Sequence, residues 1–245
     1  MTRPPALVVA GPGTNRDRDL ALALEHAGAD PTIVLVADLV ARPRMLDDAR
    51  LVAVAGGFSY GDALGAGRML ALDLKIGLGD ALARFVDSGR PVIGICNGFQ
   101  VLTRTGLLPG ALGHNAHGRF ECRWVTLEAD TASHCVWTRG IDDAIHCPIA
   151  HGEGRYVHAD PQALADAGQV ALRYRSTNPN GSDSDIAGVC NAAGNVLGLM
   201  PHPENFVVGR QHPHHGHHGH HGQHRHDDHL GLRIFRNGVT AAAGT

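Results

Sequence analysis

The apolar residues of this chain occur in short runs separated by longer stretches of helical length. The first hundred residues hold four runs rich in small and β-branched side chains, at positions 6–10, 32–36, 51–55 and 91–95. Residues 17–27 and 79–88 are rich in Ala and Leu and have the length of helices. Continuous apolar strands that alternate with helices are typical of a parallel sheet covered on both faces. The pattern therefore predicts an α/β fold.

The second half of the chain has a different pattern. Residues 119–128 and 169–175 are interpreted as strands added to the same core, with many turn-forming residues around them. Residues 207–229 are interpreted as a low-complexity insertion, because His-His-Gly repeats cannot build a core. An apolar spacing returns at 230–238 and predicts a closing helix. We expect residues 1–245 to form a single domain that carries this insertion.

Composition narrows the function classes. The formal net charge is −3 and only 4% of residues are aromatic, so the chain offers neither a basic field nor a stacking platform for nucleic acid. It has no apolar stretch long enough to cross a bilayer and no leader pattern at its start, so we expect a cytoplasmic protein without a membrane partner. Five cysteines, an odd number without a CxxC pair, are expected to stay reduced.

One cysteine occupies a position with chemical meaning. Cys96 stands between Gly94 and Gly98, where an apolar run gives way to a helical pattern. This spacing is that of a turn that holds a nucleophile in a strained conformation above a sheet edge, and it needs glycine on both sides. A helix N-terminus would favour the thiolate, and the backbone N–H of Asn97 could donate to an oxyanion. The alternative interpretation is a buried structural cysteine.

A base for this nucleophile is offered by the sequence Pro201-His202-Pro203-Glu204. We expect the two prolines to hold the segment extended, so that His202 and Glu204 point to the same side. The carboxylate could then orient the imidazole and complete a Cys–His–Glu triad. The alternative is an ordinary surface loop.

The two motifs together resemble class I glutamine amidotransferases. Further stretches are similar to the glutaminase subunits of phosphoribosylformylglycinamidine synthase, namely 11–15, 56–62, 115 with 118–120, 149–155, 178–182, 186–188 and 194–198. The resemblance spans residues 6–206 and the closing helix. It implies a flavodoxin-like, three-layer class I glutamine amidotransferase domain, with a mostly parallel central sheet and added antiparallel strands.

The resemblance also implies a reaction carried out in two places. This chain would hydrolyse L-glutamine through a thioester on Cys96. A separate synthetase subunit would use the ammonia and ATP to convert formylglycinamide ribonucleotide into the amidine of purine synthesis. A small bridging subunit is a second expected partner. The chain contains no GxxxxGK[ST] loop, so we expect no cofactor here and place ATP and Mg²⁺ on the synthetase.

The remaining site residues follow from the resemblance. The oxyanion hole would use backbone N–H groups of Gly57, Phe58 and Asn97. The glutamine pocket would be lined by Gly56, Gln100, His151 and Glu153, for each of which a purely structural role is the alternative. Residues 59–62, with Arg68 after them, resemble a loop that faces the synthetase, and the alternative is a solvated turn in which Asp62 caps the next helix.

Two features depart from the family pattern. Asn205 follows Glu204 where the family generally has arginine, so the contact of that arginine is lost or supplied elsewhere. Ten of the eighteen histidines lie between positions 212 and 229. Their glycine spacing gives no fixed ligand geometry, so we expect a solvated loop and no specific metal site.

Three other functions remain open from the sequence. The chain could feed ammonia to a different synthetase, which the identity of the aminated acceptor would decide. It could be a non-catalytic, metal-binding module that acts through its histidines, although a complete triad argues against this. It could also be a Cys–His hydrolase of peptides or γ-glutamyl compounds, which would need no synthetase.

Overall fold

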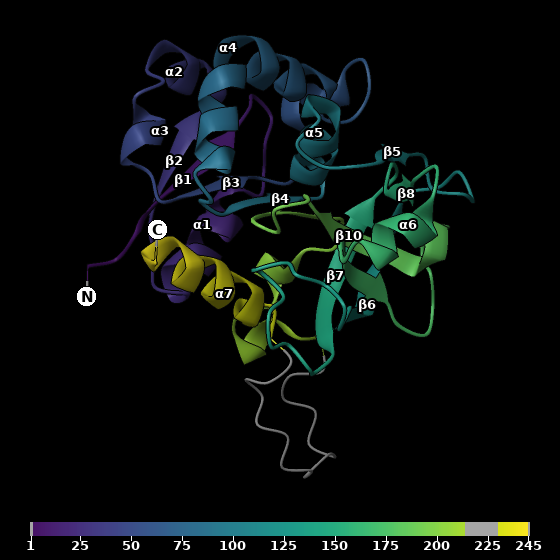
Figure 1. The fold of residues 1–245 in the computed structure, drawn as a ribbon. Helices are drawn as coiled ribbons and strands as arrows, with labels where there is room; N and C mark the ends of the chain where they lie inside the picture. Colours follow the sequence, from purple (N-terminus) through teal and green to yellow (C-terminus); the bar gives the residue numbers. More distant parts are fainter. Residues whose placement is uncertain (1, 214–229, 245) are drawn as a thin grey trace.

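The computed structural model describes residues 2–213 and 230–244 (Figure 1). Within this part of the chain, nine strands form one mixed sheet in the order β2-β1-β3-β4-β11-β10-β9-β6-β7. The parallel portion consists of β2 (Asp30–Leu35), β1 (Pro5–Ala10), β3 (Leu51–Val54), β4 (Val92–Ile95) and β11 (Val196–Leu199). The antiparallel portion consists of β10 (Ile186–Cys190), β9 (Val170–Tyr174), β6 (Glu121–Ala129) and β7 (Ile145–His151). A separate pair joins β5 (Ala111–Gly113) to β8 (Arg155–Val157).

Helices cover both faces of the parallel portion (Figure 1). One face carries α2 (Val36–Ala41), α3 (Met45–Asp48), α4 (Arg68–Asp87) and α5 (Asn97–Thr105). The other carries α1 (Asp17–His26) and α7 (Leu232–Ala243), which pack against each other. The short α6 (Pro161–Asp166) lies beside the antiparallel strands. The expected α/β class and the addition of antiparallel strands to a parallel sheet are confirmed.

Burial explains why the apolar runs became strands. Every residue of β3, β4, β10 and β11 is buried, as expected of central strands with both faces covered. The closing helix buries Ile234 and Phe235 completely, and Leu230 just before it is 4% exposed. Among the described residues, no helix has the length and apolar character needed to cross a bilayer.

The helix expected at 79–88 is the second half of a longer one. α4 begins at Arg68, after Gly67 with φ of 70°. Gly77 interrupts the first half of this helix, and glycine is a poor helix former. The structure gives a reason for Gly77: a Cβ there would lie 2.5 Å from a methyl carbon of Val40 on α2. Close packing of the two helices therefore outweighs intrinsic helix propensity.

The segment at 207–229 is described only in part. Val207 is buried, and residues Gly209–Gln211 form a 3₁₀ turn in which the Gln211 side-chain oxygen accepts from the N–H groups of Val207 and Val208 at 2.8 and 3.0 Å. The His-Gly repeats at 214–229 lie outside the described residues, so the expected insertion stays a prediction.

Strand register brings two distant parts of the sequence to one sheet edge. β4 and β11 are parallel neighbours, with Ile95 opposite Leu199, and the Cys96 N–H donates to the Leu199 carbonyl at 2.8 Å. The segments that follow these two strands must therefore emerge side by side. One contains Cys96 and the other contains His202.

Candidate active site

Cys96 lies on a strained turn between β4 and α5. Its φ of 50° and ψ of −103° are unusual for a residue other than glycine and cost conformational energy. The flanking glycines are required by space: a Cβ on Gly94 would lie 2.6 Å from the Gly98 carbonyl oxygen, and one on Gly98 would collide with the carbonyl of Val54. The spacing recognised in the sequence is therefore a steric requirement of this turn.

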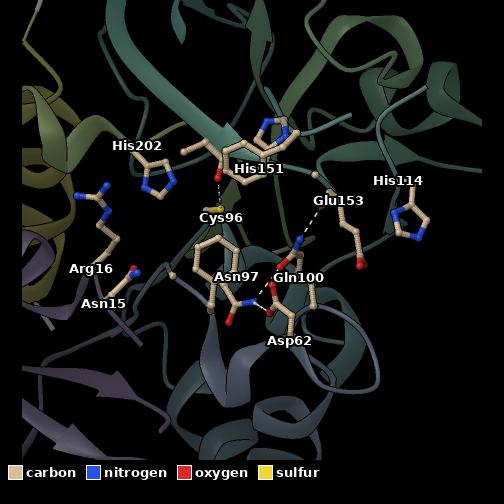
Figure 2. Close-up of a pocket in the computed structure, with 16 residues that line it drawn as sticks. Asn15, Arg16, Asp62, Cys96, Asn97, Gln100, His114, His151, Glu153 and His202 are labelled. Atoms are coloured by element: carbon tan, nitrogen blue, oxygen red, sulfur yellow. Dashed lines mark hydrogen bonds between the residues drawn. The ribbon is translucent and has the colours of Figure 1, made fainter. Parts of the chain in front are cut away.

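The turn presents Cys96 to a cavity of about 250 Å³ (Figure 2). The thiol lies 3.9 Å from the carbonyl oxygen of Ala150 on β7, and the residue is only 7% exposed. Most of the residues expected from the sequence line this cavity, namely Gly57, Phe58, Cys96, Asn97, Gln100, His151, Glu153 and His202. Two expected residues do not line it: Gly56 and Glu204.

His202 and Glu204 form a buried pair. The Nδ1 of His202 and the Oε1 of Glu204 are 2.7 Å apart, and the two residues are 3% and 1% exposed. The expectation of an extended segment is wrong, because Pro203–Asn205 is a 3₁₀ turn. Proline fits the first position of that turn, where no backbone N–H is needed. The two side chains thus meet around a turn and not along one side of a strand.

The charge balance around His202 favours the imidazolium. Burial alone would lower the pKa of His202, but the Glu204 carboxylate and the Cys96 side chain raise it, to about 10. Cys96 also contributes through a side-chain hydrogen bond to His202. A protonated imidazole beside a thiol is the arrangement that stabilises a thiolate.

Gly56 lies beside the catalytic pair, although it does not line the cavity. A Cβ on Gly56 would lie 3.1 Å from Cε1 of His202 and 3.6 Å from Cβ of Cys96. The lack of a side chain therefore allows the thiol and the imidazole to face each other. The next residue, Gly57, has φ of +100°, and a side chain there would collide with Asn15.

The three residues expected to form the oxyanion hole all line the cavity. Asn97 is the first residue of α5, so its N–H has no carbonyl four residues earlier in the helix. Gly57 and Phe58 border the same cavity after the end of β3. The Phe58 ring, 47% exposed, stacks on Phe120 with centroids 6.5 Å apart. Gly57, Phe58 and Asn97 thus border the same cavity as the thiol, and their role as an oxyanion hole stays a prediction.

A hydrogen-bond network fixes the floor of the cavity. The amide of buried Asn97 accepts from the Ser59 hydroxyl at 2.5 Å and donates to Gln100 at 3.0 Å and to Asp62 at 3.2 Å. The Gln100 amide donates in turn to the backbone carbonyl of Glu153 at 2.6 Å. Gln100 therefore positions the wall of the cavity as well as lining it.

His151 is a neutral hydrogen-bond acceptor. The Asn115 amide nitrogen donates to the carbonyls of Arg119 and His151, so its oxygen must accept from the His151 ring nitrogen Nδ1, 3.2 Å away. Burial, followed by the charge of His202, lowers the pKa of His151 to about 4. With the proton on Nδ1, Nε2 is left as an acceptor, and it is buried without a partner among the described residues.

Several cavity residues were not identified from the sequence. Asn15, Arg16, His114 and Phe120 line the cavity, and each comes from a turn or loop whose side-chain direction no periodicity predicts. Asp62 also lines it, and its carboxylate accepts a hydrogen bond from the backbone N–H of Gly67, the residue just before α4. The turn that carries Asp62 therefore contributes to the cavity as well as to the start of the helix, and the expectation of a purely solvated turn is wrong.

Asn205 has a defined contact in the structure. Its amide donates to the Asp19 carboxylate at 2.9 Å, and the same carboxylate oxygen accepts from Arg16 at 2.9 Å. Arg16 reaches the cavity from the start of α1 (Figure 2). Asn205 thus joins the turn after the His202–Glu204 pair to the cavity rim. In the described part of the chain, no three His, Cys, Asp or Glu side chains gather as they would around a metal ion.

Comparison with known proteins agrees with this geometry. Residues 3–240 match the family described as the CobB/CobQ-like glutamine amidotransferase domain. The chain is 47% identical to the phosphoribosylformylglycinamidine synthase subunit PurQ of Treponema denticola, over 85% of this chain and 90% of the relative. It is 40% identical to the subunit of the same name from Dehalococcoides mccartyi, over 98% of each.

Solved structures lead to the same group. A chain in the structure of PurLQS from Thermotoga maritima is similar with a TM-score of 0.78 and 38% identity, over 97% of this chain and 98% of that one. A glutamine amidotransferase from Thermotoga maritima, with a TM-score of 0.56 and 18% identity over 86% of this chain and 80% of that one, shares the fold. The resemblance recognised from the motifs is confirmed: the chain belongs to the PurQ family of class I glutamine amidotransferases.

Proposed function

We propose that this chain is the glutaminase of a phosphoribosylformylglycinamidine synthase, with Cys96 as its nucleophile. The observation that supports this most strongly is the strained turn that places the Cys96 thiol in a cavity beside the His202–Glu204 pair. The PurQ relatives carry the name of a subunit of this synthase, and they match nearly the whole chain. The rest of the proposal concerns which groups carry the chemistry.

The thiolate of Cys96 attacks the side-chain amide carbon of glutamine. The oxygen of the tetrahedral intermediate takes up negative charge, which the N–H groups of Gly57, Phe58 and Asn97 stabilise. The His202 imidazolium then protonates the leaving nitrogen, and ammonia departs to leave a γ-glutamyl thioester. Glu204 remains ionised throughout and holds the imidazole by its Nδ1.

The second half of the reaction regenerates the thiol. Neutral His202 removes a proton from water, which attacks the thioester carbonyl in the same oxyanion hole. Glutamate leaves, and the proton returns through His202 to the departing sulfur. The substrate is held by the walls of the cavity, to which Gly56, Gln100, His151 and Glu153 contribute by position or contact.

The ammonia is consumed on another subunit. The partners we propose are the ATP-dependent synthetase and the small bridging subunit of the same complex, by analogy with the PurLQS assembly that contains a similar chain. ATP and Mg²⁺ then bind the synthetase and not this chain. The five free cysteines agree with the cytoplasmic location that we propose for the complex.

Reconstitution tests the proposal. The chain is mixed with the synthetase and small subunit from the same genome, and amidine formation is measured with glutamine and, separately, with ammonium salts. Cys96→Ala should abolish the use of glutamine and leave the use of ammonia intact. Cys135→Ala, at a buried cysteine away from the cavity, is the matched control and should support both. Glutamine-dependent turnover by Cys96→Ala would refute the proposal.

A further inference from the structure

The outer face of α4, which lies at the periphery of the molecule, carries an exposed apolar seam (Figure 1). Leu72 is 49% exposed, and Ile76, at 77%, is the most exposed of the large apolar residues that the structure describes. Gly79 and Ala83 continue the line, so the four positions follow one another in steps of four, three and four residues. This is the spacing of residues that share one helix face and meet a partner helix. None of the four lines the cavity at Cys96, so the seam is a separate surface.

Gly79 has no steric reason within the described part of the chain to be glycine. A Cβ at this position would meet nothing within 4 Å beyond its own helix backbone, whereas one at Gly77 would collide with Val40 on α2. Glycine weakens an exposed helix, so a glycine in its middle points to a packing reason. For Gly79 that reason lies outside the chain: a position without a side chain lets the backbone of another helix come close.

The two large side chains occupy the positions that specify a two-stranded coiled coil. With Ile76 at position a of a heptad, Leu72 falls at position d, and Ala83 and Gly79 repeat a and d one step further along the helix. An isoleucine at a with a leucine at d favours a parallel pair of helices. α4 has 20 residues and is about 30 Å long, which is enough to hold the seam and the residues that flank it. The seam therefore fits one further helix that runs parallel to α4.

Charged side chains flank the seam in a complementary order. Arg68 and Lys75 fall at position g of the heptad, Asp73 and Asp80 fall at position e, and none of the four forms an ion pair with a described residue. Asp73 accepts from the Tyr60 hydroxyl at 2.5 Å, and a carboxylate can take a second donor. In a parallel pair, position g of one helix lies beside position e of the other, five residues later, so Arg68 meets Asp73 and Lys75 meets Asp80. An antiparallel pair would bring aspartate beside aspartate. The sequence of α4 is thus complementary to itself.

We propose that the outer face of α4 binds the same face of a second copy of this chain, with the two α4 helices parallel. Leu72 and Ile76 of each copy pack around the two-fold axis, Gly79 lets the helices come close, and ion pairs flank the seam on both sides. Two large apolar side chains from each copy make a small contact, so the dimer is weak and its fraction rises with protein concentration. The inference goes beyond the proposed function, because none of these residues lines the cavity.

Sedimentation velocity of the full chain tests the proposal, with EDTA present to remove metal ions that could bridge histidines. The weight-average sedimentation coefficient of the wild type should rise with protein concentration toward the value of a dimer. Ile76→Lys should raise the dissociation constant of the dimer by at least about tenfold, because each dimer loses two buried apolar side chains. Leu22→Lys, at an exposed leucine of α1, is the matched control and should dimerise like the wild type.

Exchange of the flanking charges tests the parallel orientation. Lys75→Glu should raise the dissociation constant by about three- to tenfold, because it faces Asp80 in both symmetric contacts of the dimer. The double variant Lys75→Glu/Asp80→Lys should restore the wild-type dissociation constant, since it only reverses the direction of each ion pair. Under mild oxidation, Ile76→Cys should form a disulfide between the two equivalent positions, which mass spectrometry of the digested chain identifies.

Three outcomes would overturn the inference. A wild type that stays monomeric at every concentration would do so, and if Ile76→Lys then weakened binding to the synthetase, the seam would be the docking site of that subunit instead. A dimer that Ile76→Lys leaves unchanged would place the contact elsewhere. A double variant that dimerises no better than Lys75→Glu would exclude the parallel pair. The thermal unfolding midpoint of each variant identifies any loss that comes from misfolding. Cys96→Ala should dimerise like the wild type, so failure of the proposed chemistry leaves this inference standing.

Discussion

Replacement of Glu204 by glutamine should lower the stability of the protein in a way that depends on pH. Glu204 accepts from His202 at 2.7 Å and both residues are buried, so the variant loses a charge-assisted hydrogen bond worth about 1.5 to 3 kcal/mol. The Oε2 of Glu204 has no partner among the described residues. A glutamine that keeps its oxygen toward His202 therefore places its NH₂ group where it is unsatisfied, which adds about 1 kcal/mol or more.

The free energy of unfolding should fall by about 2 to 4 kcal/mol near pH 7. The fall is no larger because His202 can lose its proton in the variant and so avoid being a buried charge without a partner. The folded-state pKa of His202, about 10, lies above the unfolded value near 6.5. The stability contributed by this pair is therefore fully present below about pH 6.5 and is lost as pH rises through about 10. The gap between wild type and Glu204→Gln should narrow over the same window.

Urea unfolding measured from about pH 6 to about pH 10.5, which spans both the unfolded-state and the folded-state pKa of His202, checks this expectation. Glu128→Gln, at an exposed position of β6, is the matched control and should follow the wild type throughout. A stability gap of the same size at both ends of the range would refute the reasoning, because it would mean that no charged pair is lost. The variant should also lower kcat for glutamine by about 100-fold or more, since His202 loses its orienting charge.

Three further changes have defined outcomes. Gly98→Ala should destabilise the chain by about 1 to 3 kcal/mol and reduce alkylation of Cys96 by iodoacetamide, because the added methyl group meets the Val54 carbonyl. Alanine has the better helix propensity, so a variant that is more stable than the wild type in urea would contradict this expectation. His151 should remain neutral, with its proton on Nδ1, as pH falls through 6.5 and should become charged only near its pKa of about 4. ¹⁵N NMR of the ring measures this protonation, and a titration near pH 6.5 would contradict the effect of burial on His151. Asn205→Ala should lower the free energy of unfolding in urea by less than about 1 kcal/mol and change kcat/KM by less than about threefold, since the variant loses one hydrogen bond to a partly exposed carboxylate. A tenfold loss of kcat/KM would show that this position takes part in catalysis.

Three strands of the parallel portion, β1, β3 and β4, could be predicted well because each lies in a continuous apolar run. The runs at 6–10, 51–55 and 91–95 differ by only one residue at an end from β1, β3 and β4. The run at 32–36 was displaced, since its last residue, Val36, begins α2. Full burial on both faces leaves little freedom in such segments, so composition alone identifies them.

The nucleophile turn could be located from the sequence because it depends on local geometry. The two glycines around Cys96 are needed to avoid clashes within a few residues and with one adjacent strand. The place of His202 and Glu204 was correct in outline, but their backbone was not, since proline fits both an extended segment and the start of a 3₁₀ turn. The contact of His202 with Cys96 depends on the pairing of β4 with β11, which no local pattern specifies.

The far side of the cavity was the least predictable part. Asp62 and His114 lie in loops, where neither helical nor strand periodicity fixes the direction of a side chain. The place of Asp62 in the cavity could not be predicted without knowing that α4 starts only at Arg68. Acceptor and donor roles, such as those of His151, follow only from a complete hydrogen-bond network.

The central claim is that Cys96 carries the glutamyl group during turnover. Acid quenching of the complete synthase while it consumes glutamine, followed by mass spectrometry of the digested chain, tests this directly. The account predicts one glutamyl group on the peptide that contains Cys96, absent from Cys96→Ala and from samples without glutamine. A glutamyl group on any of the other four cysteines, or steady hydrolysis with Cys96 unmodified at every quench time, would contradict it.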